Sequence, residues 1–287
     1  MTIADADIIR AARSLGVIGG GNHSAPRILA ALCDTGLDAR QIAAVIQRDP
    51  GLSARVLKVA NSAFYGRSRN IGSLDRALLL LGLDVVRTIA AAACLERGTP
   101  RTSMQAPIDP RALTRHCVAS AFAAESLSRH SGRATPPESF MAALLHDFGV
   151  PVQERLDSPG VVRLLQALAA DAEASPSELE DTLVQVGHAR CAAVIFEDWR
   201  LPEAIVMAVR HHDAPARAPA AARDMALLVH LGVQLALQAG FVHPLEPRPG
   251  RTARELLLRS LGLDEEAIEP IVAGLAERVQ RVTDAAG

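Results

Sequence analysis

Signals that start an α-helix recur along the whole chain, and they constrain its fold more than any other feature of the sequence. Asp38 is followed three residues later by Gln41, which is the spacing of a capping box. An acid directly before a proline, as at Asp49-Pro50 and Asp109-Pro110, is typical of a helix N-terminus. Further helix starts are predicted at Thr135, Ser175, Pro202 and Asp264, with full capping boxes at Thr135 and Ser175. Apolar residues between these starts recur at helical spacing, so the sequence predicts an all-α protein.

Two polar, proline-containing breaks divide the helical pattern, at residues 97–107 and 244–251. They predict an N-terminal helical lobe over 1–107, a helical bundle over 108–250 and a C-terminal helical appendage over 251–287. The appendage is amphipathic, so it either packs on the bundle or forms a homodimer contact. The low aromatic content of 3% also favours packed helices, because strands draw on aromatic and β-branched residues.

Charge and cysteine usage exclude several classes of protein. A net charge of −2 gives no basic excess, so a nucleic-acid partner is not expected. No C-x-x-C pair occurs, which argues against a zinc knuckle or a disulfide framework and predicts reduced core thiols at Cys33, Cys94, Cys117 and Cys191. The apolar region 77–95 contains Asp84 and Arg87 and is predicted to be a buried helix and not a membrane span. The N-terminus carries acids where a secretory signal has bases, so a cytoplasmic location is expected.

Four segments occur in a characteristic order. Residues 49–66 read DPGLSARVLKVANSAFYG, and residues 71–83 read IGSLDRALLLLGL. Residues 143–149 read ALLHDFG, and residues 187–212 contain GH, WRLP and AVRHH in turn. Together these segments resemble the HDOD family, the HD-related output domains, over about residues 15–215. The resemblance implies an all-helical fold in which an N-terminal lobe packs on an HD-like bundle. It also implies a regulatory role in bacterial signal transduction, with other signalling proteins as partners.

The resemblance to the related HD and HD-GYP phosphohydrolases also implies a candidate metal site. In those enzymes a first His, the His-Asp pair and a distant Asp hold one metal, while further His residues hold a second metal that the Asp of the pair bridges. The corresponding candidates here are His116, His146, Asp147, His188, and His211 or His212. Such ligands suit iron, manganese or zinc. The alternative is that no ion is bound and that these histidines are hydrogen-bonded core residues.

The sequence departs from the enzyme pattern at two places. The position expected for the distant Asp is Val233, so a ligand of the first metal is missing unless another acid such as Glu197 or Asp198 replaces it. The cyclic-dinucleotide phosphodiesterases carry a Gly-Tyr-Pro motif after their paired His, whereas the residues after His212 are Asp-Ala-Pro-Ala. Both departures favour a module that does not catalyse.

The remaining candidates concern recognition. Asn61, Phe64, Tyr65 and Gly66 end a predicted helix, and the two aromatic rings are expected to fill the space between the lobes or to form a partner-binding patch. Arg115 and Arg210 are candidates for contacting a phosphate. His23 and His243 are expected in solvated loops, and His130 near a helix C-terminus.

Three functions follow from these features. The first is a non-catalytic signalling module that acts through protein–protein interaction. The second is a metal-dependent HD-type phosphohydrolase that uses the His-Asp set. The third is a nucleotide-sensing pocket that binds a phosphate ligand without turnover. Bound metal and turnover distinguish them, because only the enzyme requires both.

Overall fold

The computed structural model describes residues 3–15, 24–34, 36–61, 71–97, 108–171, 174, 176–243, 245 and 251–283. Every regular element in this part of the chain is a helix, which confirms the predicted all-α class. The elements are α1 (Asp5–Ser14), α2 (Ser24–Cys33), α3 (Ala39–Ile46), α4 (Pro50–Ala60), α5 (Leu74–Leu81), α6 (Leu83–Arg97), α7 (Pro110–Ser131), α8 (Pro136–Leu145), α9 (Val150–Ala170), α10 (Pro176–Leu183), α11 (His188–Asp198), α12 (Glu203–Arg210), η2 (Pro215–Arg217), α13 (Ala220–Gln238), α14 (Arg251–Ser260) and α15 (Glu265–Thr283).

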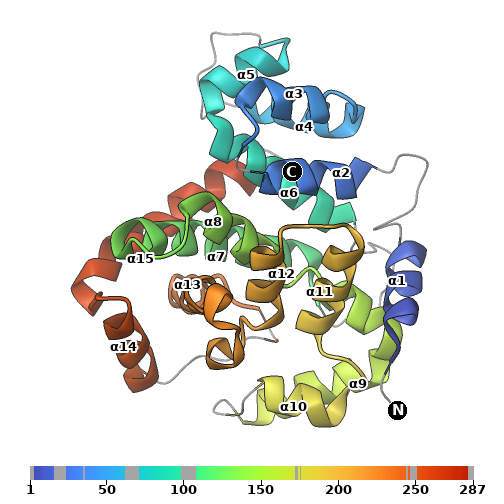
Figure 1. Cartoon of the computed structure of the whole chain (residues 1–287), viewed down its shortest axis with the longest axis vertical. Coiled ribbons are helices and arrows are strands. Elements are labelled where there is room, and N and C mark those ends of the chain that lie inside the picture. The colour runs from blue at the N-terminus through green and yellow to red at the C-terminus, as the bar shows by residue number, and fades with distance from the viewer. Residues whose placement is uncertain are drawn as a thin grey trace.

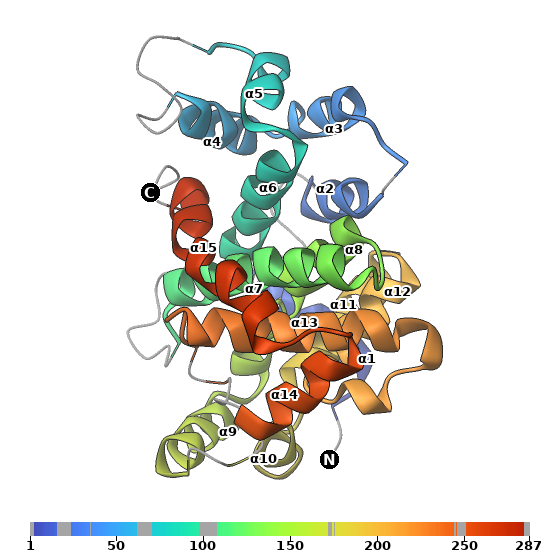
Figure 2. The ribbon, with the colours of Figure 1, turned by 90° about the vertical axis from the view of Figure 1, so that its left-hand side faces the viewer.

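Helices α2 to α6 form the N-terminal lobe, which stands on the bundle at the top of Figures 1 and 2. α2 and α6 make the joint, because α2 packs on α8 and α6 packs on both α7 and α8. The apolar region 77–95 was predicted to be one buried helix and is instead two, since α5 and the helical residues 83–94 are bent by 114°. Gly82 makes the bend, with a φ of +80° that favours glycine.

The bundle is built around α7, α8 and α13, which lie against one another below the lobe (Figure 2). Gly232 of α13 lets the two longest of these helices cross closely, because a Cβ there would stand 2.7 Å from the carbonyl oxygen of Ser120 on α7. By length and composition α13 is the only single helix in the described residues that could cross a membrane. Its apolar window is 72% buried, as expected for the core helix of a bundle.

The two chain ends both pack on the bundle. α1 lies against α9 and α11 and away from the lobe (Figure 1), and Asp5 forms an ion pair with Arg190 of α11 at 2.8 Å. α15 lies along α7, where the Arg278 guanidinium stands 4.1 Å from the centre of the Phe122 ring and pairs with Glu125 at 2.7 Å. The appendage therefore takes the first of its two predicted roles, while the boundaries at 107/108 and 250/251 stay predictions.

Most of the predicted caps form. Asp38 and Gln41 make both hydrogen bonds of the capping box, at 2.8 Å each. Asp49, Asp109 and Asp264 each accept a backbone N–H of the following helix. The capping box predicted at Thr135 is wrong, because the Thr135 hydroxyl contacts the Glu138 carboxylate and caps no backbone N–H. Ser175 lies outside the described residues. The four cysteines are buried and none forms a disulfide, as predicted.

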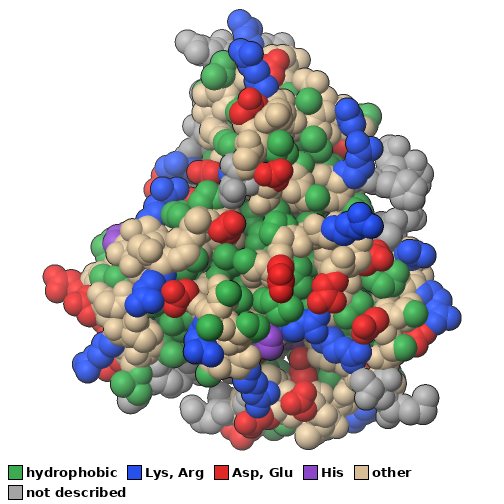
Figure 3. All heavy atoms as spheres, viewed as in Figure 1, with side chains coloured by type: hydrophobic (Ala, Val, Ile, Leu, Met, Phe, Trp, Pro, Cys, Tyr) green, Lys and Arg blue, Asp and Glu red, His purple; other side chains and the backbone are tan. Residues whose placement is uncertain are grey.

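The outer surface mixes charges of both signs. On the face shown in Figure 3, Lys and Arg side chains are interspersed with Asp and Glu side chains over both the lobe and the bundle. This mixture agrees with the net charge of −2. It gives no support to a nucleic-acid interface on that face, since such interfaces are strongly positive.

Candidate metal centre

Five bundle elements bring their histidines to one buried point. His116 lies on α7, His146 and Asp147 follow the end of α8, and His188 is the first residue of α11. His212 and Asp213 follow α12, and His243 follows α13. All five histidines and Asp147 are at most 1% exposed. The structure therefore brings together five of the six predicted metal candidates.

Backbone carbonyls fix the orientation of three imidazoles. Nδ1 of His116 donates to the carbonyl oxygen of Phe241 at 2.8 Å. Nδ1 of His146 donates to Ala143 at 2.6 Å, and Nδ1 of His212 donates to Val209 at 2.7 Å. Because a carbonyl oxygen only accepts, each Nδ1 carries the proton and each Nε2 keeps its lone pair for another partner.

The two carboxylate oxygens of Asp147 lie at the centre of the cluster. Oδ2 is 3.3 Å from Nε2 of His146 and 3.7 Å from Nδ1 of His243. Oδ1 is 3.4 Å from Nε2 of His188. Neither oxygen has a hydrogen-bond partner in the described part of the chain, and neither does Nε2 of His116. Buried polar atoms are normally paired, so this arrangement calls for a group that the side chains themselves do not supply.

Two sets of donor atoms share Asp147. His116, His146 and Asp147 have ligand atoms within 4.8 Å of one another, and so do Asp147, His188 and His212. Donors about 2.1 Å from a tetrahedral ion lie about 3.4 Å apart, which matches the separations around Asp147. Imidazoles with a shared carboxylate suit iron, manganese or zinc. The residues present therefore fit one or two transition-metal ions.

Glu180 and Gly149 hold His188 in place. The Glu180 carboxylate accepts from Nδ1 of His188 at 2.7 Å and from Nε2 of Gln153 at 2.7 Å. Gly149 follows the His-Asp pair closely, and a Cβ there would stand 2.0 Å from the carbonyl oxygen of His188. The absence of a side chain at Gly149 thus lets the N-terminus of α11 reach Asp147.

Burial and mutual charge set the ionisation of the cluster. Burial, together with the charge of His146, lowers the pKa of His116 to about 3. Burial likewise lowers the pKa of His212 and of His243 to about 4. Burial alone would raise the pKa of Asp147, but the charges of His146, His243 and His188 outweigh it and hold this pKa well below its usual value. His116, His212 and His243 are therefore neutral imidazoles near an ionised carboxylate, which is the state that a metal ion requires.

His188 is the exception among these imidazoles. Burial alone would lower its pKa, but the carboxylates of Glu180, Asp213 and Asp147 outweigh that effect and raise the pKa well above its usual value. Glu180 thereby increases the basicity of His188, as acidic partners of metal-bound histidines do.

Several predicted candidates lie outside the cluster. His211 is half-buried and is in neither set of donor atoms. Arg210 pairs with Glu197 at 2.6 Å, and the exposed Arg115 stands 5.8 Å from the Phe241 ring. Neither arginine has a position among the converging donors. Phe64, Tyr65 and Gly66 lie outside the described residues, whereas the Asn61 side chain bonds to both backbone polar groups of Ile71.

Neither of the acids expected to replace the missing Asp at Val233 lies among the donors. Glu197 is engaged by Arg210, and the exposed Asp198 belongs to neither set of donors. The carboxylate of Asp213 instead lies 3.4 Å from Nε2 of His212 and 3.6 Å from Nε2 of His188. Its signal in the sequence was a second His-Asp dipeptide, residues 212–213. His243 was also missed, because its expected place in a solvated loop is wrong: its side chain is 0% exposed.

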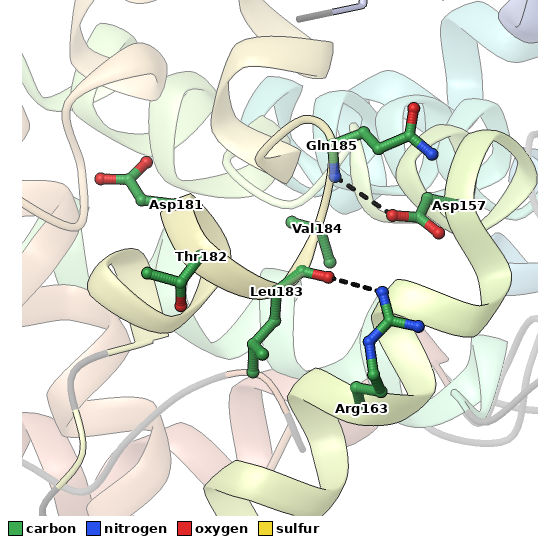
Figure 4. Close-up of a pocket in the computed structure, with 7 residues that line it drawn as sticks. All are labelled: Asp157, Arg163, Asp181, Thr182, Leu183, Val184 and Gln185. Atoms are coloured by element: carbon green, nitrogen blue, oxygen red, sulfur yellow. Dashed lines mark hydrogen bonds between the residues drawn. The ribbon is translucent and has the colours of Figure 1, made fainter. Parts of the chain in front are cut away.

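A second polar recess lies between α9 and the end of α10 (Figure 4). Asp157 lies at a kink in α9 and accepts the backbone N–H of Gln185 at 3.1 Å, while Arg163 donates to the carbonyl oxygen of Leu183 at 3.0 Å. These bonds are dashed in Figure 4 and tie the segment 181–185 to α9. The segment lies between Glu180 and Gly187, so its two bonds to α9 restrain the chain just before His188.

Comparison with known proteins gives one family and one fold. The sequence profile described as the HDOD domain matches residues 22–215. A protein of Treponema pallidum (strain Nichols), named only as uncharacterized, is 25% identical over 176 residues. That match covers 61% of this chain and 33% of the Treponema protein, so the chain spans about a third of that relative's length.

Solved structures share the fold over nearly the whole chain. A protein of Marinobacter aquaeolei VT8 that is provisionally assigned to signal transduction superposes with a TM-score of 0.77 at 24% identity, over 99% of this chain and 65% of that one. A provisionally named phosphohydrolase of Shewanella amazonensis SB2B superposes with a TM-score of 0.71 at 19% identity, over 98% of both chains. An HDOD domain protein of Geobacter sulfurreducens superposes with a TM-score of 0.66 at 20% identity, over 99% of this chain and 98% of that one. At these identities the likeness establishes the fold.

Proposed function

Because the chain belongs to the HDOD family, we propose that it is a regulatory module of signal transduction that binds other signalling proteins and does not catalyse. The provisional signalling assignment of the similar Marinobacter protein supports the regulatory part. In this proposal the cluster around Asp147 holds iron, manganese or zinc, and the ion stabilises the bundle. Zinc is the simplest choice, since mixed imidazole and carboxylate sets bind it in closed structural sites.

The observation that carries the non-catalytic part is the closure of the cluster. His116, His146, Asp147, His188 and His212 are at most 1% exposed. Among the donors only Asp213 has a side chain that reaches solvent, at 17% exposure. A hydrolytic metal keeps an open position for water and needs space for the substrate beside it. Burial of these donors therefore favours a closed, structural ion over a hydrolytic one.

One feature favours the phosphohydrolase as a second candidate. The two sets of donors share Asp147, and a pair of ions joined by one carboxylate is the arrangement of many hydrolytic centres. The provisional name of the similar Shewanella protein points the same way. A nucleotide-sensing pocket has less support, because Arg210 is engaged by Glu197 and Arg115 lies over Phe241.

Exposed leucines on the lobe support a binding role. Leu79 is 88% exposed and Leu80 is 37% exposed, both on α5 at the far end of the lobe from the bundle (Figure 1). Large exposed apolar side chains are common at sites that bind other proteins. A homodimer through this surface is one form of such binding. Light scattering of the wild type and of Leu79→Glu tests it, since a dimer through α5 becomes a monomer in the variant.

Metal content and turnover together test the proposed function. We expect elemental analysis of the untagged wild type to find about one or two transition-metal ions per chain, lost in Asp147→Ala. We expect a chelator to lower the melting temperature of the wild type, and we expect no hydrolysis of a generic phosphodiester by the loaded protein. Hydrolysis by the wild type that disappears in Asp147→Ala would contradict this proposal and show that the protein is a phosphohydrolase. If the wild type holds no metal even after loading, the metal-binding part of the proposal is wrong.

A further inference from the structure

The imidazole of His243 is buried, and its two nitrogens make no hydrogen bond to the described residues. Its side chain is 0% exposed, and neither Nδ1 nor Nε2 has a hydrogen bond within the described part of the chain. Burying a polar group in this way is unfavourable unless something binds it. Nδ1 points to the centre of the cluster, 3.7 Å from Oδ2 of Asp147, and the ring lies 5.7 Å from that of His116.

Asp147 divides the cluster into two halves, and His243 belongs to one of them. Oδ2 faces His146 and His243, whereas Oδ1 faces His188. The half at Oδ2 also holds Nε2 of His116, which has no hydrogen-bond partner in the described residues. His243 is not part of the set whose donor atoms all lie within 4.8 Å of one another, but its Nδ1 faces Oδ2 and its ring lies beside that of His116, so it borders the space that His116, His146 and Asp147 enclose.

We propose that His243 is a ligand of the ion held by His116, His146 and Asp147, and that it takes the place left by the missing acid at Val233. This inference rests on the proposed metal binding of the cluster. A site of three imidazoles and one carboxylate has four donors, which completes a tetrahedral shell. It leaves no position for a water molecule, so an ion here is structural. It also selects zinc or iron over magnesium and calcium, which prefer oxygen ligands.

The same short segment contributes twice to this half of the cluster. The carbonyl oxygen of Phe241 holds Nδ1 of His116 at 2.8 Å, and His243 follows two residues later. An ion bound by His116 and His243 therefore fastens the segment after α13 to α7.

Zinc titration of full-length variants tests the ligand. The wild type, His243→Asn and His211→Asn are stripped of metal and then titrated with Zn²⁺ against a chromophoric chelator. His211 is the matched control, because it is a half-buried histidine of the same bundle whose charged neighbours are Arg210 and Arg217, whereas His243 faces Asp147. We expect His243→Asn to weaken binding at one site by a factor of about 100 or more, and His211→Asn to bind as the wild type does.

Cobalt provides a readout that a purely structural role would not change. We expect Co²⁺ bound to the wild type to show the intense visible bands of a tetrahedral ion, and we expect His243→Cys to keep the ion and add a sulfur-to-cobalt charge-transfer band. This variant also decides the matter if His243→Asn does not fold. Equal zinc binding by His243→Asn, or a cysteine variant without the sulfur band, would overturn the role of His243 while the metal centre stands. A wild type that binds no ion would overturn both.

Discussion

A Cβ atom on Gly149 would stand 2.0 Å from the carbonyl oxygen of His188 and 2.6 Å from the backbone nitrogen of Ala192. Both contacts are to backbone atoms, so no side chain can rotate away to make room. The approach of α11 to the His-Asp pair depends on this one missing side chain.

Gly149→Ala is therefore expected to destabilise the protein and to displace His188 from Asp147. Overpacking of this kind costs about 1 to 3 kcal/mol of unfolding free energy. Urea unfolding measures the change, and zinc titration measures the effect on the cluster. Gly274→Ala is the control, because nothing lies within 4 Å of a Cβ at Gly274 inside α15 and alanine there should stabilise slightly. Equal stability of Gly149→Ala and wild type would contradict the close packing of α11.

Glu180 is expected to act on metal binding through His188. Glu180→Ala removes the acceptor of Nδ1 of His188 and also leaves Nε2 of Gln153 without its shortest bond. Loss of such a partner typically weakens metal affinity by about 10- to 100-fold. Glu180→Gln keeps an acceptor oxygen but no charge, so its metal affinity should lie between those of the wild type and Glu180→Ala.

Chelator competition measures this prediction. Glu178→Gln serves as its control, since Glu178 is exposed on the same helix. Unchanged affinity in Glu180→Ala would show that His188 needs no acidic partner or contributes no ligand atom.

Arg278 is expected to anchor the C-terminal helix. Its guanidinium contacts the Phe122 ring, pairs with the buried Glu125 and donates to Ser126 at 3.0 Å. Arg278→Ala removes all three interactions and should lower the unfolding free energy by about 1 to 3 kcal/mol. Thermal unfolding followed by circular dichroism tests it. Arg133→Ala removes a half-exposed ion pair with Asp224 and should change stability by about 1 kcal/mol at most; similar losses in both variants would argue against the anchor.

Asn61 is expected to hold the ends of the segment that joins α4 to α5. Its amide oxygen accepts the N–H of Ile71 at 2.8 Å, and its amide nitrogen donates to the carbonyl oxygens of Ile71 and Leu57. Asn61→Ala loses these bonds and should cost about 1 to 3 kcal/mol. Asn61→Asp keeps only the acceptor, so an intermediate loss in urea unfolding is expected. A neutral alanine variant would contradict this bridge.

The sequence predicted what depends on short-range patterns. The caps at Asp38, Asp49 and Asp109 form because each involves residues at most three positions apart. The lobe, the bundle and the convergence of His116, His146, Asp147, His188 and His212 followed from the family resemblance. The bend at Gly82 was missed because apolar spacing runs on through it, although glycine at that position permits a positive φ.

The rest of the centre depends on contacts that no short pattern records. His243 lies 127 positions from His116 in the sequence, and only the crossing of α7 and α13 brings the two rings together. The choice of His212 over His211 depends on which side chain faces inward at the end of α12, where Val209 holds Nδ1 of His212. Gly149 and Gly232 looked like ordinary glycines, because the backbone atoms they admit come from distant helices.

The position of α1 determines when this helix can pack during synthesis of the protein. Asp5 pairs with Arg190, 185 positions later, so α1 leaves the ribosome long before α11 is made. At a synthesis rate of about 5 to 20 residues per second, α1 waits roughly 10 to 40 s for α11. Its apolar face, with Ile8, Ala11 and Ala12, lacks α11 during that interval and lacks α9 for most of it. Newly made chains therefore pass through a window in which this face is open to chaperones, and slower translation lengthens that window.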